Sequence, residues 1–96
     1  MIAAEYQKMK QNFVDKGIPV VLGEYAAPRR NDPNKPLPKD TLMHNKSVDY
    51  WTTFTTKTAK ANGLLPFWWE VGSMLDRANN VVKDQPLLDA IKAGYQ

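Results

Sequence analysis

The 96-residue chain contains no cysteine, which excludes a disulfide scaffold and any metal site built on thiolates. It has a single histidine, and no stretch is long and apolar enough to span a membrane. The first six residues, MIAAEY, lack the basic start and apolar core of a secretory signal. Carboxylates and aromatic rings are therefore the main groups left to carry chemistry.

A concentrated basic face is also missing. The net charge is +3, and the longest basic cluster, Arg29-Arg30, is followed at once by Asp32. A nucleic-acid interface requires basic residues gathered on one face and interleaved with aromatic residues. We therefore expect neither a nucleic-acid nor a membrane partner. The hydrophobic fraction of 43% and the charged fraction of 24% are typical of a globular protein, and the length allows at most one small domain.

An apolar run from Gly17 to Tyr25, GIPVVLGEY, holds the first candidate functional residue. A short run rich in β-branched residues after a glycine predicts a strand of a parallel sheet, buried on both faces. Glu24 stands near its carboxyl end, where α/β folds place ligands and catalytic groups. Because a buried carboxylate without a partner is costly, a functional position for Glu24 is favoured.

A second run, GLLPFWWEVG from Gly63 to Gly72, repeats this arrangement. It again follows a helix-ending glycine and again ends in aromatic and then acidic residues. Sugars stack their apolar faces on flat aromatic rings, and paired carboxyl groups break glycosidic bonds. Two parallel strands that bring carboxylates and indole rings to one edge of a sheet predict a carbohydrate site.

Three amphipathic helices are expected around the two strands. The first covers residues 2–16 and ends at Gly17, the second covers about 47–61, and the third begins at Asp84 as N-cap. The buried side of the second helix is expected to hold Val48, Trp51, Phe54, Thr58 and Ala59. Residues 26–45, with four prolines, form a long loop that should build part of the wall of the site.

The order helix, strand, helix, strand, helix predicts a parallel sheet with right-handed crossovers. Two parallel strands are too few to protect their own edges. The pattern therefore favours part of a larger barrel over a complete domain.

In this order and spacing, the two strand motifs and the ending MLDRANN followed by Asp84-Gln85 resemble glycoside hydrolase family 5 over essentially the whole chain. The resemblance implies an α/β fold: residues 1–96 would form the C-terminal portion of a (β/α)8 TIM barrel, comprising helix 6, strand 7, helix 7, strand 8 and helix 8. It also implies a secreted, retaining endo-β-1,4-glucanase that hydrolyses cellulose or related β-glucans with no metal and no organic cofactor.

By this resemblance Glu24 occupies the position of the catalytic nucleophile. Trp69 matches the eighth-strand tryptophan that stacks under the sugar at the cleavage point. Trp68 should point the other way, toward the helices, because strand side chains alternate, although it stays a candidate for substrate binding with Tyr25 and Glu70. Glu70 stands where relatives often carry aspartate, and either an ion pair that anchors a loop or a hydrogen bond to substrate would suit it.

The remaining polar residues are expected to lie on the surface, in ion pairs or in the loop. His44 is expected on the surface or in the loop, and Asp76 and Arg77 are expected to form a loop-closing ion pair. Three loop residues could reach substrate, with nothing in the sequence to rank them: Arg29, Asn31 and Asp32.

The family's acid/base glutamate on strand four has no counterpart here, so the remaining barrel strands, on another chain or in a missing segment, are an expected partner. Two alternatives stay open. One is a mannan- or xyloglucan-cleaving relative, and the other is a non-catalytic carbohydrate-binding module that uses Trp68 and Trp69 as a platform.

Overall fold

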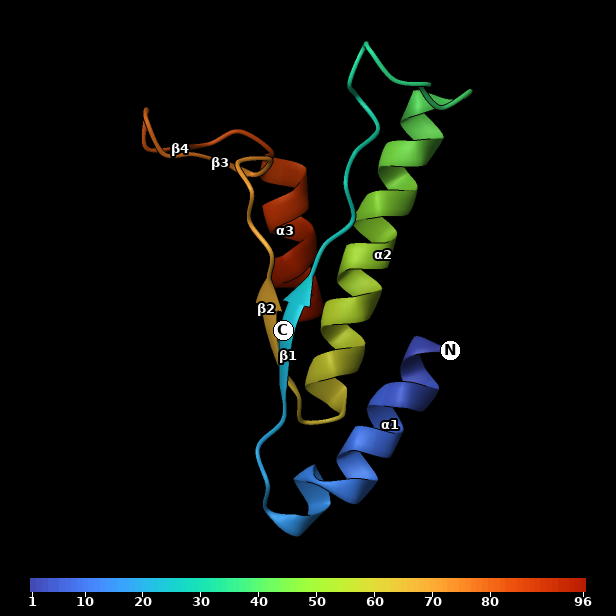
Figure 1. The fold of residues 1–96 in the computed structure, drawn as a ribbon, viewed down its shortest axis with the longest axis vertical. Helices are drawn as coiled ribbons and strands as arrows, with labels where there is room; N and C mark the ends of the chain where they lie inside the picture. Colours follow the sequence, from blue (N-terminus) through green and yellow to red (C-terminus); the bar gives the residue numbers. More distant parts are fainter.

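A computed structural model describes all residues 1–96 (Figure 1). Its elements in chain order are α1 (Ile2–Asn12), the 3₁₀ turn η1 (Val14–Lys16), β1 (Val21–Tyr25), α2 (Thr41–Ala61), β2 (Leu65–Trp68), β3 (Leu75–Asp76), β4 (Val81–Val82) and α3 (Gln85–Gly94). The predicted alternation of three helices and two main strands is confirmed. No helix combines the length and apolar character needed to cross a membrane.

Strands β1 and β2 pair in parallel, as predicted, with Val21 opposite Leu65 and Tyr25 opposite Trp68. The register shifts between Leu22 and Tyr25, which marks an irregularity at Gly23-Glu24. The pairing extends one residue beyond β2, because the Trp69 amide donates to the Tyr25 carbonyl at 3.0 Å. The carboxyl ends of both strands therefore lie side by side at one edge.

The prediction that the first strand is buried on both faces is wrong for this chain. Within β1 only Tyr25 is buried, and Val21 is 53% exposed. In β2 the side chains alternate: Trp68 packs on the core formed by Val48, Met74 and Leu87, whereas Leu65 and Phe67 are about half exposed. Helices α2 and α3 thus cover one face of a two-stranded sheet, and the other face has no covering layer.

Helices α2 and α3 pack closely through small side chains. A β-carbon on Gly94 would lie 2.6 Å from the Thr53 carbonyl oxygen, so only glycine fits there. Thr52, Thr55 and Thr56 are buried, and the hydroxyls of Thr52 and Thr56 donate to carbonyls four residues earlier.

This close contact rotates the buried side of α2 away from the expected face. Phe54, expected inside, is 40% exposed and stacks on Tyr50 at a centroid distance of 6.2 Å. Trp51 and Thr58 are only half-buried, whereas Val48 and Ala59 are buried as expected. Thr53 and Thr56 meet α3 at Gly94 in place of the larger rings.

The long loop is shorter than predicted, because α2 begins at Thr41 rather than near residue 47. Asp40 caps it by accepting from the Met43 amide at 3.0 Å. His44 therefore lies in the first turns of α2, half-buried, and not in the loop. Its Nε2 accepts from the Arg30 amide at 3.0 Å, which ties the loop to the helix.

Two smaller features also differ from expectation. The first helix ends at Asn12 and is followed by η1, although Gly17, at φ 79°, ends the helical segment as predicted. The segment between β2 and α3 is not simply a loop: Leu75 and Asp76 pair in antiparallel fashion with Val82 and Val81. Asp84 caps α3 as predicted, accepting from the Leu87 amide.

Candidate active site

Glu24 and Trp69 lie at the carboxyl ends of the two parallel strands and line one hollow of about 400 Å³. Both side chains are exposed, Trp69 by 52%. Glu24 takes part in none of the five ion pairs of the chain. The carboxylate is therefore free to meet a ligand, with an exposed indole ring beside it.

Tyr25 is buried and held by α2, so it faces away from solvent. Its hydroxyl and that of Thr56 share a hydrogen bond of 2.7 Å. Burial raises the pKa of Tyr25, and the hydrogen bond with Thr56 offsets part of that rise. The Tyr25 ring packs against Trp51 and, edge to face at 5.3 Å, against Trp68. Its position secures the strand end next to Glu24.

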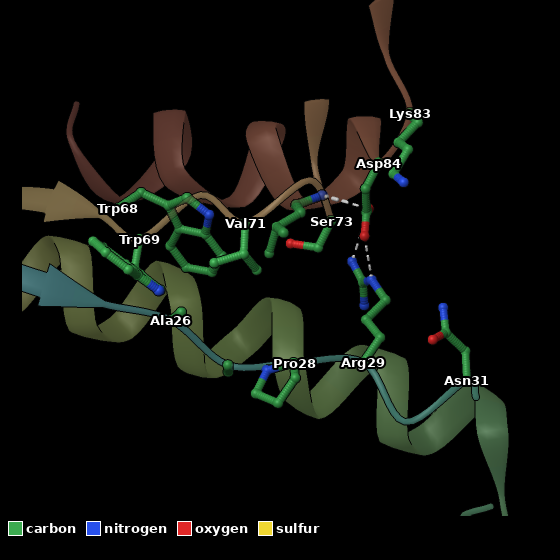
Figure 2. A pocket seen from close by; sticks show the side chains of 12 residues that line it. Ala26, Pro28, Arg29, Asn31, Trp68, Trp69, Val71, Ser73, Lys83 and Asp84 are labelled. Atoms are coloured by element: carbon green, nitrogen blue, oxygen red, sulfur yellow. Dashed lines mark hydrogen bonds and ion pairs between the residues drawn. The ribbon is translucent and has the colours of Figure 1, made fainter. Parts of the chain in front are cut away.

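The two adjacent tryptophans have different surroundings, as strand alternation predicts, although both border a second cavity. Trp68 is half-buried against the helices, and its indole nitrogen is buried with no hydrogen-bond partner. Trp69 borders the hollow with Glu24 and also a second cavity of about 430 Å³, shown in Figure 2. The second cavity lies between residues 26–31, which follow β1, and the segment that follows β2. Packing of Trp68 against the helices is confirmed, and sugar stacking by Trp69 stays a prediction.

Arg29 forms a polar cluster with four hydrogen bonds from one guanidinium group, and its bonds to Asp84 are drawn in Figure 2. Its guanidinium donates to both carboxylate oxygens of Asp84, at 2.6 and 3.1 Å, to Asp49 at 2.5 Å and to the Asn45 carbonyl at 3.1 Å. Its side chain is only 14% exposed. The hydrogen bonds from Arg29 hold the pKa of Asp84 below its usual range, and those with Asp84 and Asp49 raise the pKa of Arg29.

Two carboxylates near the end of β2 are committed to the backbone. Glu70 accepts from the amides of Gly72, at 2.5 Å, and Met74, at 3.2 Å, so it anchors a loop without an ion pair. The predicted Asp76–Arg77 ion pair is wrong: Asp76 accepts instead from the Ala78 amide and from Asn79 in a local turn. These bonds to Asn79 lower the pKa of Asp76. No three acidic or histidine side chains come together where they could hold a metal ion.

The sequence did not reveal the partners of Arg29 or Tyr25. Asp84 lies 55 residues from Arg29 and was recognised only as a helix cap, and Thr56 lies 31 residues from Tyr25. Of the loop residues that could not be ranked, Asn31 borders the second cavity, whereas Asp32 lies 3.8 Å from Lys35 in an exposed ion pair.

Residues 1–74 match the family model described as cellulase, glycosyl hydrolase family 5. The chain belongs to glycosyl hydrolase family 5. Endoglucanase A of Paenibacillus barcinonensis is 28% identical over 100 residues, covering 97% of this chain and 23% of that protein.

Two solved family 5 structures have the same fold over nearly all of the chain. One is a xyloglucan-specific β-1,4-glucanase from a ruminal metagenomic library, in complex with XXLG. It is 28% identical, with a TM-score of 0.84 over 97% of this chain and 26% of that chain. The other is a Bacteroides ovatus xyloglucanase in complex with an XXXG heptasaccharide. It is 25% identical, with a TM-score of 0.86 over 98% of this chain and 20% of that chain. The 96 residues thus span about a quarter of these family 5 proteins.

Proposed function

We propose that this chain supplies the seventh and eighth strands of a retaining endo-β-1,4-glucanase, with Glu24 as nucleophile and Trp69 as the platform under the sugar. The observation that carries the proposal is the placement of these two residues. They stand at the ends of adjacent parallel strands, both exposed, on one hollow. The match to a glycosyl hydrolase family supports the assignment of hydrolysis.

The chemistry needs a second carboxyl group. In a retaining hydrolase the nucleophile attacks the anomeric carbon while an acid about 5 to 5.5 Å away protonates the leaving oxygen and later activates water. The other two glutamates are engaged elsewhere: Glu5 pairs with Lys8 on α1, and Glu70 is bound to backbone amides. The acid/base group therefore comes from the remaining barrel strands, which this chain must join to form the site.

A β-1,4-glucan backbone is the favoured substrate, and xyloglucan is the second candidate. Endoglucanase A supports the first, and the two xyloglucan-directed structures support the second. The second cavity beside Trp69 offers room for a group attached to the main chain. Because such polysaccharides are extracellular polymers, we also propose that the complete enzyme acts outside the cell.

The test is complementation. The 96-residue chain is coexpressed with, or fused to, the part of a family 5 relative that carries strands one to six. Reducing-sugar release is then measured on carboxymethylcellulose and on xyloglucan. The relative's own two parts, separated at the same place, are the positive control. We expect activity only when both parts are present.

The alternative of a binding module predicts a different result. A module would bind cellulose in a pull-down as the 96-residue chain alone and would gain no activity from strands one to six. That outcome, with an active positive control, would contradict the proposal.

A further inference from the structure

The segment that follows Glu24 is fixed at both ends to the same helix. Tyr25 is held to Thr56, and Arg29 is held to Asp49, both on α2. Asp49 and Thr56 are seven residues apart, so they share a face of the helix and lie about 10.5 Å apart along its axis. Four extended residues span at most about 14 Å. The chain between the two anchors, which runs alongside α2 in Figure 2, therefore has little slack.

Arg29 is also connected to the end of the other strand. It binds both oxygens of Asp84, whose amide, with that of Lys83, donates to the Met74 carbonyl at 3.3 and 2.8 Å. The Met74 amide in turn donates to Glu70, the residue that follows Trp69. A continuous series of hydrogen bonds thus connects the segment after Glu24 with the segment after Trp69.

We propose that Arg29 is a positioning residue that fixes the Glu24 strand end relative to Trp69 through Asp84, Met74 and Glu70. This inference rests on the proposed function, because its importance depends on Glu24 and Trp69 acting on one sugar. Arg29 lies outside the hollow that Glu24 and Trp69 share and borders the second cavity, so it acts on Glu24 through the backbone and does not touch the reacting atoms.

The guanidinium group suits this role for a physical reason. Arg29 serves three acceptor residues at once, two on α2 and the N-cap of α3, with the planar, bidentate geometry that a lysine ammonium does not offer. It is mostly buried, so water competes poorly for these bonds. Misplacement of a reacting group by about 1 Å costs on the order of 100-fold in rate. A variant that holds the Glu24 strand end less firmly should therefore have a lower kcat.

The experiment compares Arg29 with its neighbour in the completed barrel. Arg29→Lys and Arg29→Met are measured beside Arg30→Lys and Arg30→Met. Arg30 is a matched control because it is exposed and its side chain donates only to the Pro36 carbonyl. For each variant, kcat, KM and the melting temperature are determined, together with hydrogen exchange of the Met74 and Lys83 amides.

On an unbranched β-1,4-glucan, which leaves the second cavity empty, we expect Arg29→Met to lower kcat by about 10- to 100-fold at nearly constant KM, measured well below its melting temperature. Arg29→Lys should recover part of this loss, and both Arg30 variants should match the unmodified protein. Faster exchange of the Met74 amide should accompany the loss in the Arg29 variants only. A kcat within twofold of the unmodified protein in folded Arg29→Met would show a merely structural role and overturn the proposal.

Failure of the proposed function would be seen separately, as an inactive unmodified barrel beside an active positive control. The exchange measurement then decides the connection between the two strand ends without activity. Unchanged protection of the Met74 and Lys83 amides in Arg29→Met would overturn the connection between the strand ends. Faster exchange of these two amides in Arg29→Met, but not in Arg30→Met, would support it.

Discussion

The isolated 96-residue chain should not unfold as a cooperative monomer, because it exposes too much surface for its mass. Its accessible surface is 6844 Å², whereas a folded monomer of 10.9 kDa exposes about 5,600 Å². Its radius of gyration is 15.2 Å, compared with about 12.5 Å for a compact domain of this length. Only 11 of the 96 residues are buried.

The hydrophobic stabilisation that the isolated chain lacks can be calculated from its surplus accessible surface of roughly 1,200 Å². If about 57% of it is apolar, leaving it in water forgoes on the order of 17 kcal/mol at ~25 cal/mol per Å². That is as large as the whole net stability of a typical domain, about 5–15 kcal/mol. The exposed Val21, Leu65 and Phe67 are part of this surface.

Far-UV circular dichroism melts and size-exclusion chromatography test the prediction. We expect a broad, weakly cooperative melt or self-association for the chain alone, and a sharp transition once strands one to six are present. A sharp cooperative melt of the monomeric chain would refute the reasoning and favour a small self-sufficient α/β module.

Three further predictions concern the completed barrel. Gly94→Ala should destabilise it by about 1–3 kcal/mol, because the new methyl meets the Thr53 carbonyl. Chemical denaturation of the variant and of the unmodified protein measures the difference. Because Arg29 lowers the pKa of folded Asp84, the stabilisation is present above the pKa of an unfolded aspartate and is lost as the pH falls through the lower pKa of folded Asp84. Asp84→Asn should therefore flatten the acid limb of stability against pH. Trp69→Ala should weaken oligosaccharide binding and rate together by about 1–3 kcal/mol, and calorimetry showing unchanged affinity would contradict sugar stacking.

The elements with strong periodicity and clear end signals were predictable from the sequence. Gly17 ends a helical segment and Asp84 begins a helix, as their residue types indicate. Trp68 packs against the core whereas Trp69 lines the hollow with Glu24, as strand alternation predicts. These features depend on a few neighbouring residues, so local rules suffice for them.

Most errors arose where distant contacts decide, and the start of α2 is a local exception. The start of α2 was missed because Thr41 to Met43 are exposed and show no apolar stripe, although Asp40 is an ordinary N-cap. Phe54 was placed inside because its size suggests a core residue, but Gly94 lets α3 approach the threonines instead. The role of Arg29 depends on Asp84, 55 residues away, and no local pattern connects them.

The central claim, that Glu24 is the nucleophile, is tested most directly by Glu24→Gln in the completed barrel. The amide keeps the shape of the side chain but cannot attack as an anion, so turnover should fall by several orders of magnitude while substrate binding is largely retained. Azide should partly rescue Glu24→Ala and give an α-configured product, because the anion takes the place of the carboxylate. If Glu24→Gln kept more than about a tenth of the activity of the unmodified protein, which is a barrier change under ~1.4 kcal/mol, the assignment would be contradicted.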